Sequence, residues 1–192
     1  MTPQDHPDVP AVTPHDPALP AIDRPIVLVG MMGSGKSSVG RRLAARLDLP
    51  FFDADDEIET AAGLKIAEIF QRYGEPYFRD GERRVIQRLI EAGPCVLATG
   101  GGAFAQADTR QLILDKGLAI WLDVPVSILV ERTARRSHRP LLNQGDPRET
   151  LTRLLKEREP AYAQAQLRVK TDQTPHARAV ESIVALLKEH FA

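Results

Sequence analysis

One short stretch constrains the fold of this chain more than any other. Residues 30–37 read Gly-Met-Met-Gly-Ser-Gly-Lys-Ser, which matches the pattern G-x-x-x-x-G-K-[ST] of a phosphate-binding loop. An apolar run over residues 26–29 precedes the stretch, and apolar residues at helical spacing follow it, namely Val39, Leu43 and Leu47. The order of buried strand, glycine-rich loop and helix predicts an α/β fold with this loop at the carboxyl end of a parallel strand.

The residues of the loop suit the phosphates of ATP. Gly33 and Gly35 allow positive φ, so successive N–H groups can curl round an anion at a helix N-terminus. Lys36 adds a cation for the β- and γ-phosphates, and Ser37 offers a hydroxyl to Mg²⁺. The alternative is a glycine-rich turn without function, which the flanking strand and helix disfavour. The predicted ATP-binding residues here are Gly33, Ser34, Gly35, Lys36, Ser37 and Ser38.

Composition excludes several classes of protein. The 25 basic and 26 acidic residues give a net charge of −1, so nothing points to nucleic acid or an anionic membrane. No apolar run approaches the roughly 18 residues that span a bilayer. Cys95 is the sole cysteine and lies in an apolar run, which indicates a core residue rather than a nucleophile. We therefore expect a cytoplasmic protein without a nucleic-acid or membrane partner.

The N-terminus differs from the rest of the chain. Residues 1–25 hold 7 of the 15 prolines and show no hydrophobic periodicity. Such a segment buries too little apolar surface to offset its ordering entropy. We expect residues 1–24 to be a disordered extension, and residues 25–192 to form a single domain.

Strand-like and helix-like segments alternate after the loop. Four further short strands are predicted at 51–53, 95–99, 118–122 and 167–169. Helices are predicted at 66–73, 76–92 and 106–116, from Pro125, from Arg148 to Pro160, and at 179–191. This alternation predicts a three-layer α/β/α sandwich with a five-stranded parallel sheet.

Carboxylates follow the second predicted strand. Alternation along an extended chain would put Asp53 and Asp55 on one side, at the edge where ligands bind in such sheets. One carboxylate could then serve Mg²⁺ and the other an acceptor hydroxyl. The alternative is simple capping of the next helix, which is the only role that we expect of Asp56 and Glu57.

Three further features lie near predicted strand or helix ends. Three glycines, residues 100–102, follow the third strand and let a ligand approach backbone N–H groups closely. Arg79 lies one turn before Glu82, and on spacing alone a solvated charge pair is the better interpretation. Arginines, including Arg132 and Arg139, crowd an irregular segment, which suits a lid over the triphosphate at about residues 132–148; a solvated basic loop is the alternative.

Taken together, these residues resemble the shikimate kinase family. The matching segments are residues 30–38, 53–55, Phe78-Arg79 with Glu82, 100–102, 139–142 and 158–162, in order and at similar spacing. The resemblance covers about residue 25 to the end. It implies a P-loop fold like that of the nucleoside monophosphate kinases, and transfer of the ATP γ-phosphoryl group to the 3-hydroxyl of shikimate with Mg²⁺, on the route to chorismate and the aromatic amino acids.

The resemblance also implies roles on the acceptor side. Asp55 would hold the shikimate hydroxyls and act as base or orienter for the attacking 3-hydroxyl. Arg79 and Arg158 would clamp the shikimate carboxylate, which overrides the interpretation of Arg79 as a solvated residue. Gly101 and Gly102 would lend backbone N–H groups to the same substrate.

On the nucleotide side, the resemblance implies a second set of roles. Lys36 and Arg139 would neutralise charge on the transferring phosphoryl group. Ser37, with Asp53 through water, would hold Mg²⁺, and Arg132 would lie against the adenine or the phosphates. A monomer is implied as well.

Two positions in the core depart from the family pattern. Ser38 stands where the family commonly has threonine, and Lys65 where serine or threonine often caps the next helix, so we expect weaker capping there.

Three other interpretations of the function remain. The nearest rival is another kinase on the same scaffold, acting on gluconate or a nucleoside monophosphate. A GTP switch lacks support because no Asn-Lys-x-Asp segment occurs. A non-catalytic nucleotide-binding module is disfavoured by the intact Lys36, Ser37 and Asp55.

Overall fold

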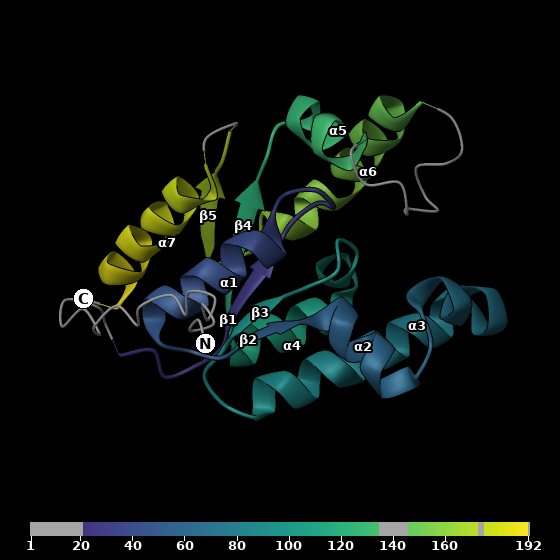
Figure 1. The fold of residues 1–192 in the computed structure, drawn as a ribbon, viewed down its shortest axis with the longest axis horizontal. Helices are drawn as coiled ribbons and strands as arrows, with labels where there is room; N and C mark the ends of the chain where they lie inside the picture. Colours follow the sequence, from purple (N-terminus) through teal and green to yellow (C-terminus); the bar gives the residue numbers. More distant parts are fainter. Residues whose placement is uncertain (1–20, 135–145, 173–174, 192) are drawn as a thin grey trace, which may run out of the picture.

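The computed structural model describes residues 21–134, 146–172 and 175–191, and within them the predicted parallel sheet is confirmed (Figure 1). The five strands lie in the order β2-β3-β1-β4-β5. Their bounds are Ile26–Val29 (β1), Phe51–Asp53 (β2), Val96–Ala98 (β3), Leu118–Asp123 (β4) and Leu167–Lys170 (β5).

The strand order places the phosphate loop at the centre of one sheet edge. Leu28 of β1 pairs with Ala98 of β3 on one side and with Ile120 of β4 on the other. Asp53, the last residue of β2, also pairs with Ala98. The carboxyl ends of β1, β2 and β3 therefore lie side by side, as the ligand-binding edge of an open parallel sheet requires.

Seven helices and one 3₁₀ turn cover the two faces of the sheet in the described residues. They are α1 (Lys36–Leu47), α2 (Ala54–Ala62), α3 (Ile66–Glu91), η1 (Ala103–Ala105), α4 (Ala107–Lys116), α5 (Val126–Ala134), α6 (Pro147–Tyr162) and α7 (His176–His190). Figure 1 shows α1 and α7 beside each other, away from the other helices.

Two core clusters follow from the alternation of side chains along β1. Ile26 and Leu28 point into the cluster with α1 and α7, which includes Leu43 and Ile183. Val27 and Val29 point into the larger cluster on the opposite face, which contains residues of α3, α4, α5 and α6. A strand buried on both faces explains why residues 26–29 are apolar without interruption.

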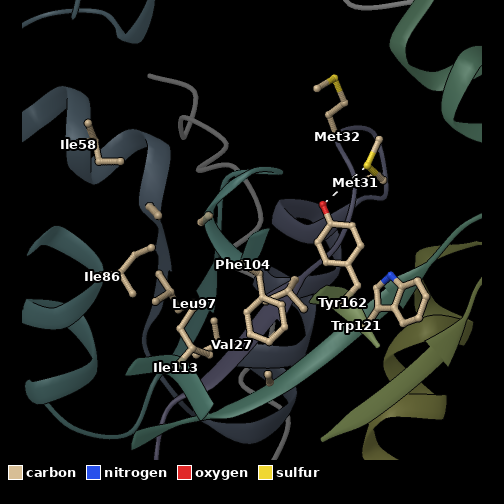
Figure 2. Close-up of a cluster of buried hydrophobic side chains, with 14 of the residues drawn as sticks. Val27, Met31, Met32, Ile58, Ile86, Leu97, Phe104, Ile113, Trp121 and Tyr162 are labelled. Atoms are coloured by element: carbon tan, nitrogen blue, oxygen red, sulfur yellow. Dashed lines mark hydrogen bonds between the residues drawn. The ribbon is translucent and has the colours of Figure 1, made fainter. Parts of the chain in front are cut away.

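The larger cluster also contains Trp121 and Cys95, of which sequence analysis assigned Cys95 to the core. Trp121 is 2% exposed and stacks on Tyr162 with ring centroids 5.8 Å apart (Figure 2). Cys95 is 1% exposed, and burial raises the pKa of its thiol to about 11. A thiol of that pKa is inert at neutral pH, as expected of a structural cysteine.

Helix ends account for the differences from the predicted elements. The predicted break between two helices is confirmed at Gly74 (φ 79, ψ 174), although the helical segments join directly as α3. Pro160 was expected to end α6, but the helix continues to Tyr162. The buried ring of Tyr162 packs in the core, so tertiary contacts stabilise this last turn despite the proline.

The start of α3 is also better capped than Lys65 suggested. The backbone N–H of Lys65 donates to Glu68 Oε2 (2.9 Å), and the N–H of Ile66 donates to Glu59 Oε1 (3.0 Å). These two carboxylates serve the N–H groups of the N-cap residue and of the first helical residue, whereas a serine or threonine cap would have served that of the second or third.

No helix in the described ranges combines the length and the apolar character needed to cross a membrane.

Candidate active site

The phosphate loop follows β1 and adopts the backbone that its glycines permit. Gly33 (φ 81) and Gly35 (φ 92) lie in the left-handed region, where side chains cause strain. A Cβ at Gly33 would lie 2.9 Å from Cγ2 of Thr133, so the loop packs closely on α5. The curled loop leads directly into α1, whose N-terminus favours an anion.

Lys36 lies inside this loop. Its side chain is largely buried, and Nζ donates to the carbonyl oxygens of Gly30 and Met31, both at 2.8 Å. Ser34 Oγ lies 3.4 Å from the same Nζ. The ammonium is thus held at the concave side of the loop, within reach of phosphate oxygens bound there.

Ser37 and Asp53 join the loop to the end of β2. The hydroxyl of Ser37 donates to Oδ2 of Asp53 at 2.5 Å. Oδ1 of Asp53 accepts the backbone N–H of Asp55 at 3.1 Å, so Asp53 also caps α2. Asp53 therefore caps α2 and also contacts Ser37 of the phosphate loop, so its capping role does not exclude the functional one.

Strand alternation does not bring Asp55 beside Asp53, contrary to the prediction. The chain is not extended there, because Asp55 lies in the first turn of α2. That first turn still brings its carboxylate to the cleft, since both Asp53 and Asp55 line it.

The donor set of Ser37 and Asp53 fits Mg²⁺. Across the described ranges, no group of three or more His, Cys, Asp or Glu side chains could hold a metal ion. Mg²⁺ needs no such cage, because it usually keeps several waters and binds one or two protein oxygens together with substrate phosphates. The adjacent hydroxyl and carboxylate beside the phosphate loop supply such oxygens.

The three glycines after β3 form a tight turn against charged side chains. A Cβ at Gly100 would lie 2.9 Å from Glu82 Oε1 and 3.0 Å from Asp55 Oδ1. A Cβ at Gly102 would lie 2.6 Å from Nη2 of Arg79. Any larger residue at either position would displace these side chains.

Arg79 approaches the turn from α3, and its pair with Glu82 is not the solvated pair that spacing suggested. Nη1 of Arg79 donates to Glu82 Oε2 at 2.7 Å, and the Glu82 side chain is only 1% exposed. Glu75 adds a second carboxylate at 3.1 Å. Burial raises the pKa of Glu82, while Arg79 opposes that rise. The buried carboxylate fixes the direction of the guanidinium.

Arg158 approaches the same turn from α6. Its Nη1 donates to the carbonyl oxygen of Gly101 at 3.0 Å. The hydroxyl of Tyr162, one helical turn later, donates to the same carbonyl. Two guanidinium groups, from α3 and α6, therefore flank residues 100–102.

The phosphate loop, the carboxylates and the glycine turn enclose one cleft of about 430 Å³. Its lining includes nine residues that sequence analysis assigned to the site, namely Gly33, Gly35, Lys36, Ser37, Ser38, Asp53, Asp55, Gly101 and Arg132. Gly102 belongs to the glycine turn beside the cleft, and Arg79 and Arg158 flank this turn. Arg139 and most of the expected lid lie outside the described residues, as do residues 1–20 of the N-terminal extension.

Sequence analysis missed three residues that line the cleft, Met32, Thr99 and His176. His176 is the first residue of α7, and a Cβ at Gly35 would lie 3.0 Å from its Cε1 and 3.7 Å from Nη1 of Arg132. Arg132 also donates to the carbonyl oxygen of Asp172 at 3.2 Å. The sequence signal that could have found His176 was its position after β5, because the carboxyl end of every parallel strand faces the ligand-binding edge of the sheet.

A cleft lined by a phosphate loop and by a glycine turn that two guanidinium groups flank suits a nucleotide beside a small anionic acceptor. Fold and site together define a P-loop kinase of small molecules. The family model described as shikimate kinase matches residues 32–188. Since this match spans well over half of the chain, the chain belongs to the shikimate kinase family.

Individual relatives agree with that family. A shikimate kinase of Bradyrhizobium diazoefficiens is 56% identical over 168 residues, which cover 88% of this chain and 81% of that protein. One from Caulobacter vibrioides is 55% identical and covers 92% of this chain and 88% of that protein. The shikimate kinase of Acinetobacter baumannii, solved in complex with shikimate, superposes with a TM-score of 0.84 at 39% identity, covering 87% and 94%.

A gluconokinase from Sinorhizobium meliloti also superposes, with a TM-score of 0.57 at 20% identity, covering 87% of this chain and 93% of that one. An identity this low shows a shared fold alone. The gluconate reading therefore gains nothing from this likeness beyond the common scaffold.

Proposed function

We propose that this chain transfers the γ-phosphoryl group of ATP to the 3-hydroxyl of shikimate, giving shikimate 3-phosphate and ADP. One observation carries the proposal: Arg79 and Arg158 flank a glycine turn that shares a cleft with a phosphate loop. Guanidinium groups bind carboxylates through paired, charge-assisted hydrogen bonds. Shikimate carries one carboxylate and three hydroxyl groups.

The acceptor side positions shikimate for attack. Arg79 and Arg158 would bind its carboxylate, and the N–H groups of Gly101 and Gly102 would add backbone donors. Asp55, at the cleft wall, would accept a hydrogen bond from the 3-hydroxyl. Fixing both ends of the small molecule in this way aligns its reacting oxygen with the γ-phosphorus, which is a large part of catalysis by proximity.

In the transfer itself, the 3-oxygen forms a bond to the γ-phosphorus as the bond to the β,γ-bridging oxygen breaks. The proton of the 3-hydroxyl passes to the Asp55 carboxylate, and the bridging electrons leave with ADP. Lys36 and Arg139 would hold the negative charge that spreads over the phosphoryl oxygens. Ser37, and Asp53 through water, would hold Mg²⁺, which would supply positive charge against the phosphate oxygens.

The remaining nucleotide contacts would come from the phosphate loop and from Arg132, which lies close to Gly35. Residues 33–38 would cradle the phosphates, and Arg132 would lie against the adenine or the phosphates. We also propose that the enzyme acts as a monomer in the cytoplasm, in line with the family resemblance.

The deciding experiment measures ADP release with Mg-ATP and one of three acceptors: shikimate, gluconate or a nucleoside monophosphate. We expect release with shikimate alone. ADP release with gluconate instead would support kinase activity but show that shikimate is not the acceptor. Absence of ADP release with every acceptor, despite ATP binding, would support the non-catalytic reading.

A variant pair tests the carboxylate clamp within that assay. Arg79→Ala should raise the KM for shikimate by about ten- to a hundredfold, the loss expected for hydrogen bonds to a charged group. Arg83→Ala is the matched control. Arg83 lies on the same helix, but it pairs with Asp80 (3.1 Å) and not with the glycine turn. Equal kinetics for the two variants would refute the clamp.

A further inference from the structure

Tyr162 has no role in the mechanism above, yet its hydroxyl contacts Gly101, which lines the cleft. The side chain is fully buried in α6, and its hydroxyl donates to the carbonyl oxygen of Gly101. We propose that Tyr162 is a positioning residue for the acceptor. It fixes the peptide between Gly101 and Gly102, and thereby aims the Gly102 N–H at the bound carboxylate. This inference rests on the proposed function.

The peptide plane transmits the effect. In a trans peptide, the carbonyl of one residue and the N–H of the next are coplanar and point in opposite directions. The described chain contains no cis peptide bond. When Tyr162 draws the Gly101 carbonyl toward α6, the Gly102 N–H must point away from α6. Gly102 also lies close to the guanidinium of Arg79, since a Cβ at Gly102 would be 2.6 Å from Nη2.

A residue that fixes this peptide must itself be held in place, and contacts on several sides hold the Tyr162 side chain. Its ring stacks on Trp121 with centroids 5.8 Å apart, and its hydroxyl lies 3.7 Å from Sδ of Met31 in the phosphate loop (Figure 2). Burial raises the pKa of Tyr162, so the hydroxyl keeps its proton and stays a donor at neutral pH. A glycine pair needs such a support because glycine backbones are otherwise permissive.

Arg158 alone does not supply this support. It donates to the same carbonyl at 3.0 Å, but it is only partly buried. The proposed function also requires its guanidinium to bind the acceptor carboxylate. Tyr162 carries no charge and makes no direct contact with the acceptor, so its hydrogen bond persists while Arg158 turns to the ligand.

Tyr162→Phe removes the hydroxyl and keeps the ring, and Trp121→Phe is the control that disturbs the stack without touching the hydroxyl. For Tyr162→Phe, we expect the Kd of shikimate by calorimetry and the KM for shikimate to rise about five- to tenfold, the size of one hydrogen bond. The KM for ATP should stay within twofold of the wild-type value. Trp121→Phe should lower the melting temperature and raise the KM for shikimate by clearly less than Tyr162→Phe does, because the hydroxyl that donates to the Gly101 carbonyl remains.

Three outcomes overturn the inference. The first is unchanged shikimate binding in Tyr162→Phe. The second is an equal rise in the KM for both substrates. The third is a shikimate defect in Trp121→Phe as large as that in Tyr162→Phe, which would show that packing alone matters. If the wild-type chain itself fails to use shikimate, the proposed function fails first, so the two failures are distinguishable.

Discussion

At the scale of single residues, neighbouring carboxylates on α2 occupy different environments. Asp55 lines the cleft, whereas Asp56 is exposed and lies 3.8 Å from Arg41. Successive residues of a helix point about 100° apart, so a single step along α2 separates a side chain that faces the cleft from one that faces solvent. The pair therefore offers a matched test of the base.

Asp55→Asn should lower kcat by about a hundredfold or more while the KM for ATP is retained, because a positioned acid–base group contributes on that order. Asp56→Asn should leave kcat within twofold of wild type. Steady-state ADP release measures both variants. Near-normal turnover of Asp55→Asn would exclude a role for its carboxylate in proton transfer.

At the scale of elements, two helical glycines differ in what surrounds them. Gly40 lies on the buried face of α1, and a Cβ there would be 2.5 Å from Cε2 of Phe51 in β2. Gly81 lies in α3 with nothing within 4 Å of such a Cβ. Gly40 thus allows α1 to approach the sheet, whereas Gly81 has only the usual helix-weakening effect of glycine.

Gly40→Ala should lower the free energy of unfolding by about 1–3 kcal/mol, because the added methyl group overpacks the contact between α1 and β2. Gly81→Ala should raise that free energy by about 0.5–1 kcal/mol through helix propensity alone. Urea denaturation of both variants measures the difference. Stabilisation by Gly40→Ala would show that Phe51 can move aside.

At the scale of the whole molecule, the two core clusters use residues from Ile22 onward. Ile22 packs against the cluster of α1 and α7, and the carbonyl of Pro25 accepts the N–H of Leu118 at 2.8 Å. The domain boundary expected at residue 25 therefore lies slightly too late for the packing, because Ile22 already contributes to the core.

A chain that begins at residue 21 should keep the melting temperature and both KM values of the full chain, since residues 1–20 have the composition of a segment that cannot form a core. Differential scanning calorimetry and the ADP assay test this. Removing Ile22 as well should lower the melting temperature. A large loss on removing residues 1–20 alone would show that the proline-rich segment contributes to folding or activity.

Sequence by itself determined the local framework of this protein. The apolar runs predicted all five strands, most directly β1, β3 and β4, which are almost entirely buried. The glycine-rich motif located the loop after β1 because its glycines must adopt positive φ. Composition and periodicity carry such information because these are short-range requirements of the backbone and of burial.

Only the tertiary structure decided what depends on distant segments. Strand order placed β1 between β3 and β4, and a helical turn rather than strand alternation brought Asp55 to the cleft. Burial converted the spacing of Arg79 and Glu82 into a fixed ion pair, and the extension of α6 past Pro160 brought Tyr162 to Gly101. Residues 61 positions apart meet only because the packed core overrides local propensity, and that energy is absent from any short window of sequence.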